Sequence, residues 1–374
     1  MLDKYSFDSY GVFFRDLNLN DLDRVPIRPL GKVSDYVVAT FPGRLIDVRD
    51  GRDTLDHLSA EVEGLLLQHY SHCDIHEMTG SDLAVARLDS QMLRSGLKRL
   101  NPNVDAGKTA SLEPNLSKLT ELLSGLTRQP NIITYNDVAR SNPATDPRTF
   151  TSGKIGHSEA GFYLLHERIE QKLDLVAERL LQGIGLVRLG HFNEFAASLI
   201  DSSKEEFTDA VRYQARFIAM KKADFDIFRE FLKGYDGLPG ASGLFSSGIL
   251  MLDALLVGYQ LPADYFSEAK KGLSEGFYPK REKVYDAFAV AESRNSLMDL
   301  AFRERDSKLS RAVAGLMQAV IYFRERHYNL VLKKIQTVAS DTAAGTAIKQ
   351  NSGSFLRERI AGYKTAHASL LEIL

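Results

Sequence analysis

Apolar residues recur with helical spacing along most of this chain, and the clearest case is the stretch 309–335. Six positions there follow one another in steps of three or four residues: Val313, Leu316, Val320, Phe323, His327 and Leu330. This spacing places all six side chains on one stripe of an α-helix that faces a core. His327 is the one member that is not apolar, so its ring nitrogens need partners. A bound metal ion or a backbone carbonyl of the core would serve, and both interpretations stay open.

Similar patterns predict further helices along the chain. The expected ranges are 58–69, 81–100, 112–126, 159–186, 203–235, 249–259, 280–305 with a break near Ser293, and 355–371. Ser81 or Asp82 is expected to cap the second of these helices. Residues 36–41 read Tyr-Val-Val-Ala-Thr-Phe between prolines, a pattern typical of a short β-strand. The predicted fold class is mainly α, with a large all-helical domain and a smaller mixed or helical N-terminal domain.

The boundary between these domains is expected where the helical pattern lapses. Residues 130–156 are loop-like and contain the breaks Asn142-Pro143 and Asp146-Pro147. We therefore predict a small N-terminal domain over residues 1–130 and a large helical domain over residues 131–374. A chain of 374 residues is long enough to build both.

The amino-acid composition excludes several classes of protein and of cofactor site. Apolar residues make up 44% of the chain and charged residues 26%, which is typical of a globular protein. A net charge of −2 gives no reason to expect a nucleic-acid partner. Cys73 is the only cysteine, which excludes an internal disulfide, an iron–sulfur site and covalent attachment of haem through two cysteines. With no apolar run of about 18 residues and no signal peptide, we expect a cytoplasmic protein without a membrane partner.

Asp253 interrupts an otherwise apolar helix over residues 249–257. A carboxylate buried there is costly unless it is paired and hydrogen-bonded. Arg324, one turn before His327, is the expected partner. The pair has two open interpretations: a purely structural ion pair, or a support that holds the helix of His327 in place.

Polar residues elsewhere in the helical half suggest ligand contacts, each with a plainer alternative. The glycine-rich link 237–248 lacks phosphate-loop patterns, but its small residues and Ser242 would permit close approach to a flat ligand or form a plain linker. Ser352 and Gly353 end a polar loop before the last helix, where they would bind an anion or simply cap the helix. Arg216 would grip a carboxylate or lie at the surface.

Two groups of histidines complete the candidates. His157, at the start of a long helix, would face a ligand pocket or lie in the region of the helix cap. His69, His72 and His76 would share a face of one helix next to Cys73, a combination of side chains that binds zinc, although no second group completes a tetrahedral set.

The helical half resembles the haem-dependent dioxygenases that open the indole ring of tryptophan, closest to the indoleamine 2,3-dioxygenase type. It is also similar to their relative in pyrrolnitrin biosynthesis, monodechloroaminopyrrolnitrin synthase. The resemblance covers roughly residues 130–374 and rests on the segments 161–163, 216–237, 241–243 and 323–331. The segment 323–331 reads Phe-Arg-Glu-Arg-His-Tyr-Asn-Leu-Val, with an arginine three residues before the histidine.

The resemblance implies a role for each candidate residue. His327 would be the axial ligand of the haem iron, with Asp253 paired to Arg324 behind it. Arg216 would hold the substrate carboxylate, and the remaining implied contacts are with the cofactor or the closing loop: Ser242 beside the haem propionates, and Ser352 and Gly353 in the loop. The family's distal serine falls near Ser158 or Glu159, beside His157. The closing loop has fewer glycines than the family's loop, which leaves the substrate open.

The chemistry implied is that of an oxidoreductase with haem b, iron protoporphyrin IX, as cofactor and O2 as co-substrate. The expected substrate is tryptophan or a related indole, and the expected reaction is cleavage of the 2,3 bond of the indole. One alternative is an oxidative rearrangement of a substituted tryptophan, as in pyrrolnitrin biosynthesis. Another is a haem-binding or sensor protein without turnover. The resemblance also makes a homo-oligomer plausible.

Overall fold

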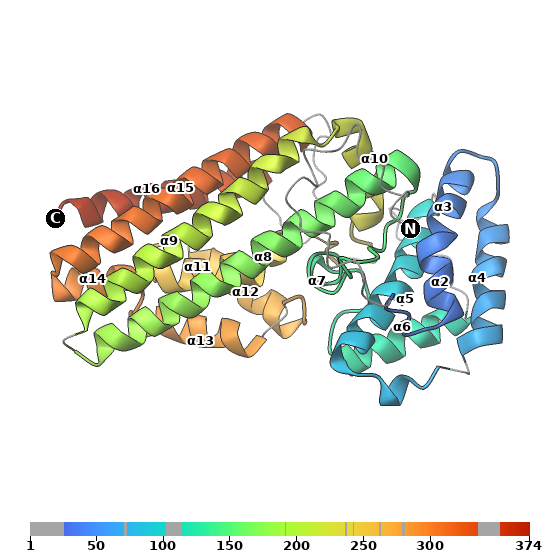
Figure 1. Cartoon of the computed structure of the whole chain (residues 1–374), viewed down its shortest axis with the longest axis horizontal. Coiled ribbons are helices and arrows are strands. Elements are labelled where there is room, and N and C mark those ends of the chain that lie inside the picture. The colour runs from blue at the N-terminus through green and yellow to red at the C-terminus, as the bar shows by residue number, and fades with distance from the viewer. Residues whose placement is uncertain are drawn as a thin grey trace. The chain divides into compact units, whose positions relative to one another are not determined.

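The computed structural model describes residues 26–70, 73–101, 114–190, 192–235, 238–241, 243–261, 263–278, 281–335 and 352–374. Within these ranges every regular element is helical and there is no strand (Figure 1). The predicted mainly α class is therefore confirmed. Contacts divide the described residues into two compact units, one made of the described parts of residues 1–164 and 216–244, the other of the described parts of residues 165–215, 245–340 and 350–374. The domain boundary at residue 130 stays a prediction.

The first unit is built from short and medium helices. They are α2 (Lys32–Ala39), α3 (Phe41–Arg49), α4 (Leu55–His69), α5 (Gly80–Leu100), α6 (Pro114–Thr127), α7 (Tyr135–Ala139), the start of α8 (Gly153–Arg188) up to residue 164, and α10 (Lys222–Leu232). Helix α5 packs against α2, α3, α4, α6, α7 and α10. It therefore forms the centre of this unit.

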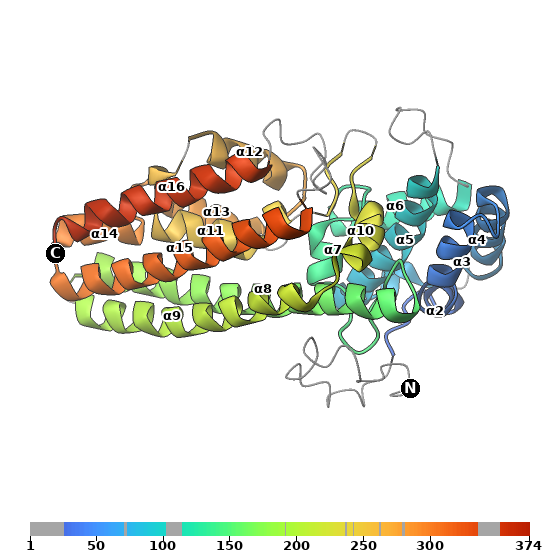
Figure 2. The ribbon, with the colours of Figure 1, turned by 90° about the horizontal axis from the view of Figure 1, so that it is seen from above.

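The second unit consists of longer helices. They are the rest of α8, then α9 (Asn193–Arg216) up to residue 215, α11 (Ser247–Leu256), α12 (Ala263–Ser274), α13 (Arg281–Glu292), α14 (Leu297–Glu304), α15 (Ser307–Ile335) and α16 (Ser352–Leu371). Helices α15 and α16 pack along each other, as both views show (Figures 1 and 2). The predicted break near Ser293 is confirmed, since α13 ends at Glu292 and α14 begins at Leu297.

The β-strand expected over residues 36–41 is wrong. Those residues lie in α2 and at the start of α3, where Val33 and Val37 are buried one turn apart. Burial on a helical stripe outweighs the β-propensity of valine, which is a weak and context-dependent preference. Pro42, one of the flanking prolines, lies in the first turn of α3, a position that suits proline.

The single helix predicted over residues 203–235 is also wrong. Helix α9 ends at Arg216, a short 3-10 turn follows, and the extended backbone of Met220 and Lys221 precedes α10. The break falls where the chain passes from the second unit to the first, so the apolar residues of α9 and α10 serve two different cores. The cap of α5 is likewise neither Ser81 nor Asp82: Thr79 accepts the hydrogen bond from the backbone N–H of Asp82.

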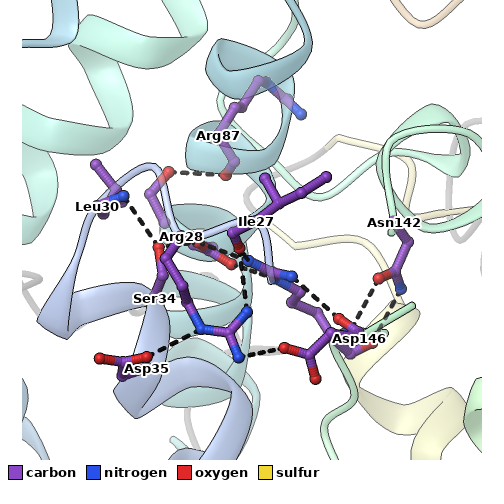
Figure 3. A network of polar contacts seen from close by, with 11 residues as sticks. Ile27, Arg28, Leu30, Ser34, Asp35, Arg87, Asn142 and Asp146 are labelled. Atoms are coloured by element: carbon purple, nitrogen blue, oxygen red, sulfur yellow. Dashed lines mark hydrogen bonds and ion pairs between the residues drawn. The ribbon is translucent and has the colours of Figure 1, made fainter. Parts of the chain in front are cut away.

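A buried polar network ties the beginning of the described chain to the rest of the first unit (Figure 3). Asp89 and Arg148 are both fully buried, and Arg148 Nε lies 2.7 Å from Asp89 Oδ1. Ser34 donates a hydrogen bond of 2.6 Å to the other carboxylate oxygen, and Arg148 donates one of 2.6 Å to the carbonyl of Ile27. Arg28 adds ion pairs to Asp35 and Asp146. The network therefore joins residues 27–28, α2, α5 and the loop before α8.

None of the helices that the structure describes combines the length and the apolar character needed to cross a bilayer.

Candidate functional site

Asp253 is the centre of a buried charged cluster in the second unit. The residue is fully buried on α11, and its carboxylate is paired with the guanidinium of Arg324 on α15. The ion pair expected between these residues is therefore present. The presence of the ion pair does not test its predicted role in supporting a cofactor, which stays a prediction.

Each carboxylate oxygen of Asp253 faces one arginine and accepts a hydrogen bond from one tyrosine. Oδ1 accepts from Arg324 and, at 2.8 Å, from the hydroxyl of Tyr363 on α16. Oδ2 accepts from the hydroxyl of Tyr265 on α12 at 2.8 Å and lies 3.8 Å from Nη2 of Arg359 on α16. Burial raises the pKa of both tyrosines well above its ordinary value, so both hydroxyls keep their protons and donate.

The arginines of this cluster also face aromatic rings. Arg324 Cζ lies 5.0 Å from the ring centroid of Tyr363, and Arg359 Cζ lies 3.8 Å from that of Tyr265. A guanidinium over an aromatic ring gains electrostatic energy that grows when water is excluded. The Asp253 cluster, defined as Asp253, Tyr265, Arg324, Arg359 and Tyr363, thus joins α11, α12, α15 and α16.

His327 lies one helical turn beyond Arg324 on α15. The predicted apolar stripe is buried from Val313 through Phe323, whereas His327 and Leu330 are only half-buried. The imidazole therefore lies where the stripe leaves the core. Its ring is stacked on Phe323 with 6.3 Å between centroids, and Phe323 in turn packs edge-on against Phe207 of α9 at 5.3 Å.

The surroundings of His327 keep its imidazole neutral. Desolvation of the ring, together with the electrostatic effects of His166, Arg324 and Arg359, lowers its pKa from 6.5 to about 4. A neutral imidazole is the form that binds a metal ion. The imidazole of His327 is therefore in the protonation state of a metal ligand, and its role at a haem iron stays a prediction.

His166 on α8 is a neighbour of His327 that sequence reasoning missed. It lies one turn before Glu170, a buried residue that accepts a hydrogen bond from Ser246, the N-cap of α11. A Cβ at Gly248 would lie 2.6 Å from Cβ of Leu173, so only glycine lets α11 approach α8 this closely. This packing holds the His166 region of α8 beside α11, and His166 acts electrostatically on His327.

Ser158 and Glu159 lie in the first unit, where both side chains are buried. Ser158 donates a hydrogen bond of 2.6 Å to Asp224 of α10. The carboxylate of Glu159 accepts from the backbone N–H groups of Phe150 and Thr151 at 2.7 and 2.9 Å, and also from the Thr151 and Tyr163 hydroxyls. Burial outweighs these four donors and raises the pKa of Glu159 to about 7. Both residues thus fasten the start of α8 to neighbouring segments, and a catalytic role for Ser158 stays a prediction.

His157 and Arg216 are half-buried residues of the first unit. Next to Arg216 in sequence, Phe217 belongs to an aromatic cluster centred on Phe162, whose ring centroid lies 5.3 Å from Phe217, 5.5 Å from Phe225 and 5.4 Å from Phe228. This cluster packs the start of α8 against α10. The substrate and distal roles assigned to Arg216 and His157 stay predictions.

The remaining candidates lie at or beyond the limits of the described chain. Ser242 lies outside the described residues, as does most of the loop predicted over residues 340–354. Ser352 and Gly353 fall in the first turn of α16 rather than in a loop before it, because this helix begins at Ser352. Their predicted contact with the cofactor stays a prediction.

The zinc alternative loses its geometric basis. Helix α4 ends at His69, and His76 lies in a separate 3-10 turn, Ile75–Glu77, so these residues do not share a face of one helix. His72 lies outside the described residues. Among the residues whose positions are described, no three histidine, cysteine or carboxylate side chains form a group that could hold a metal ion.

No known family model matches this chain, and no curated protein matches it either. The resemblance to the haem-dependent dioxygenases therefore stays a prediction. Sequence reasoning found Asp253, Arg324 and His327 but missed Arg359 and Tyr363. A signal for these two exists, because the buried positions 356, 359, 363, 366 and 370 of α16 follow the same steps of three and four residues as the stripe of α15.

Proposed function

We propose that this chain is a b-type haem oxygenase that acts on tryptophan or a related indole, with His327 as the axial ligand. The observation that carries the proposal is the position of His327 where the buried stripe of α15 leaves the core, one turn from the buried Arg324–Asp253 pair. The lowered pKa of its imidazole agrees with this role. Bound haem would supply the redox chemistry and the position at which O2 reacts.

The residues of the chain would position the reactants. His327 would offer its lone pair to the iron, while Asp253 and Arg324 hold α15 and thereby the orientation of the imidazole. Arg216 would bind the substrate carboxylate through paired N–H groups. Ser242, Ser352 and Gly353 are proposed contacts of the cofactor and the closing loop.

On the substrate side, the hydroxyl proton of Ser158 is committed to Asp224, which favours His157 over Ser158 for handling a proton there. His166 is proposed to lie near the iron on the evidence of its charge effect on His327. In purified protein, His166→Ala should leave the His327-dependent Soret band in place and change its spin-state bands.

The proposal is tested by titrating the purified protein with hemin and recording the Soret band. The His327→Gly variant should lose the band of the imidazole-ligated iron, and added free imidazole should restore it by filling the vacated position. His57→Ala is the matched control, because His57 is an exposed histidine of the first unit paired with Asp53. A His327→Gly protein that binds hemin with an unchanged spectrum would reject His327 as the ligand.

The substrate and the reaction are tested by oxygen uptake and product mass. Uptake that depends on L-tryptophan, with a product that gains two oxygen atoms, would support 2,3-cleavage. A substituted tryptophan converted without that gain would instead indicate the oxidative rearrangement. Hemin binding without indole-dependent uptake would indicate a haem carrier or sensor.

We further propose that the protein works in the cytoplasm with a small aromatic substrate, without nucleic-acid or membrane partners. Assembly into a homo-oligomer belongs to the same proposal, and light scattering of the purified chain would test it.

A further inference from the structure

Helix α16 supplies half of the groups that surround the Asp253 carboxylate. Tyr363 is fully buried and donates 2.8 Å to Oδ1, the oxygen that Arg324 also uses. Arg359, with an exposed fraction of 4%, lies 3.8 Å from Oδ2. Both residues come from a helix that contributes no proposed ligand of the iron.

The connection from α16 to His327 runs through Arg324. This arginine is held on two sides, by the Asp253 carboxylate and by the face of the Tyr363 ring at 5.0 Å. His327 follows Arg324 by three residues on the same helix, so its imidazole moves with the backbone that Arg324 anchors. Removing a donor from the carboxylate loosens that anchor without touching the histidine.

We propose that Arg359 and Tyr363 are positioning residues that fix the imidazole of His327 through Asp253 and Arg324. The clamp is defined as the contacts of Arg359 and Tyr363 with Asp253 and, through it, Arg324. Its effect on bound haem rests on the proposed function, whereas the contacts themselves lie within α11, α15 and α16. Outer groups that orient a metal ligand commonly change metal affinity by about 10- to 100-fold when they are removed.

The first variant is Tyr363→Phe, which deletes the hydroxyl and keeps the ring that faces Arg324. We expect hemin affinity to fall by about tenfold, at the lower end of the range for such groups, and the midpoint potential of the bound iron to shift. Tyr322→Phe is the matched control, since Tyr322 is an exposed tyrosine of α15 bonded to Arg326 and not to Asp253.

The second pair of variants separates charge from packing. Arg359→Met should lower hemin affinity as Tyr363→Phe does, and Arg359→Lys should recover part of it, because lysine restores the positive charge near Asp253. Arg311→Met, an exposed change on α15, is the control. If both Arg359→Met and Tyr363→Phe lower the unfolding temperature but leave hemin affinity and midpoint potential at wild-type values, the two residues are structural only and the inference is overturned.

Amide hydrogen exchange over residues 320–330, measured without hemin, separates this inference from the proposed function. Faster exchange there in Tyr363→Phe than in Tyr322→Phe would support the clamp even if the wild-type protein shows no His327-dependent Soret band, a result that rejects the proposed function alone. Unchanged exchange in Tyr363→Phe would overturn the clamp whatever hemin does.

Discussion

Asp253 and Arg324, which lie 71 positions apart in the chain, form an ion pair whose exposed fractions are 0% and 4%. Because Asp253 also contacts Tyr265, Tyr363 and Arg359, its single negative charge faces two buried guanidinium groups at once. The pair is therefore asymmetric: loss of the carboxylate leaves more buried charge without a partner than loss of either arginine does.

This asymmetry predicts the effect of Asp253→Ala. The variant leaves two arginines buried without their carboxylate, and we expect it to lower the unfolding free energy by about 3–5 kcal/mol. Arg324→Met removes one cation and leaves the carboxylate paired with Arg359, so it should cost less. Chemical denaturation of both variants measures the difference, and equal losses would contradict the asymmetry.

The second prediction concerns Glu159→Gln. All four groups that contact the Glu159 carboxyl donate hydrogen bonds to it. In Glu159→Gln the amide nitrogen replaces one acceptor. The hydroxyls of Thr151 and Tyr163 can rotate to accept, but the backbone N–H of Phe150 or Thr151 then loses its partner. We expect a cost of about 1–3 kcal/mol, the penalty of an unsatisfied buried donor. Unfolding no easier than in the wild type would show that the amide is accommodated.

The same carboxyl predicts a dependence of stability on pH. Its pKa of about 7 in the folded protein exceeds the ordinary 4.5, so the folded state holds a proton that the unfolded state releases. The stabilisation is fully present below pH 4.5 and is lost as the pH rises through about 7, by on the order of 3 kcal/mol. Unfolding free energies at several pH values should decline more steeply for the wild type than for Glu159→Gln. Parallel curves would assign the pH dependence to other groups.

His327 predicts a titration of opposite sign. Because its pKa is lowered to about 4, the ring should stay neutral across the range from about pH 5 to pH 8, where an ordinary histidine titrates. The contribution of the neutral His327 ring to stability is fully present above pH 6.5 and is lost as the pH falls through about 4. Imidazole chemical shifts of His327 in the hemin-free protein, recorded across this pH range, would measure the titration directly. A midpoint near pH 6.5 for His327 would show that its surroundings do not lower its pKa.

Two glycines offer a matched pair for packing. A Cβ at Gly96 of α5 would lie 2.7 Å from Cζ of Phe41, whereas a Cβ at Gly64 of α4 would meet nothing within 4 Å. Gly96→Ala should therefore destabilise the protein by about 1–3 kcal/mol through overpacking. Gly64→Ala should stabilise it by about 0.5–1 kcal/mol, because alanine favours the helix. Thermal unfolding of both variants is the measurement, and changes of the same sign would argue against this packing of α5 on α3.

The helical class and most helices could be predicted from the spacing of apolar residues, since each long stripe has to meet a core. The failures share one cause. The valines of residues 36–41 have a local preference for strands, and the break after Arg216 carries no proline or glycine. In both places the packing of distant residues outweighs the local pattern.

The sequence by itself determined that α15 has one buried face, that His327 continues the stripe of that face, and that a buried Asp253 needs a cationic partner. These follow from helical periodicity and from the cost of burying a charge, which act within one element. Only the tertiary structure decided that Arg359, Tyr363 and Tyr265 share this carboxylate, that Glu159 is enclosed by four donors, and that His166 acts on His327. Such groupings depend on how helices that are far apart in the chain pack together. The spacing of these residues in the sequence does not predict that packing.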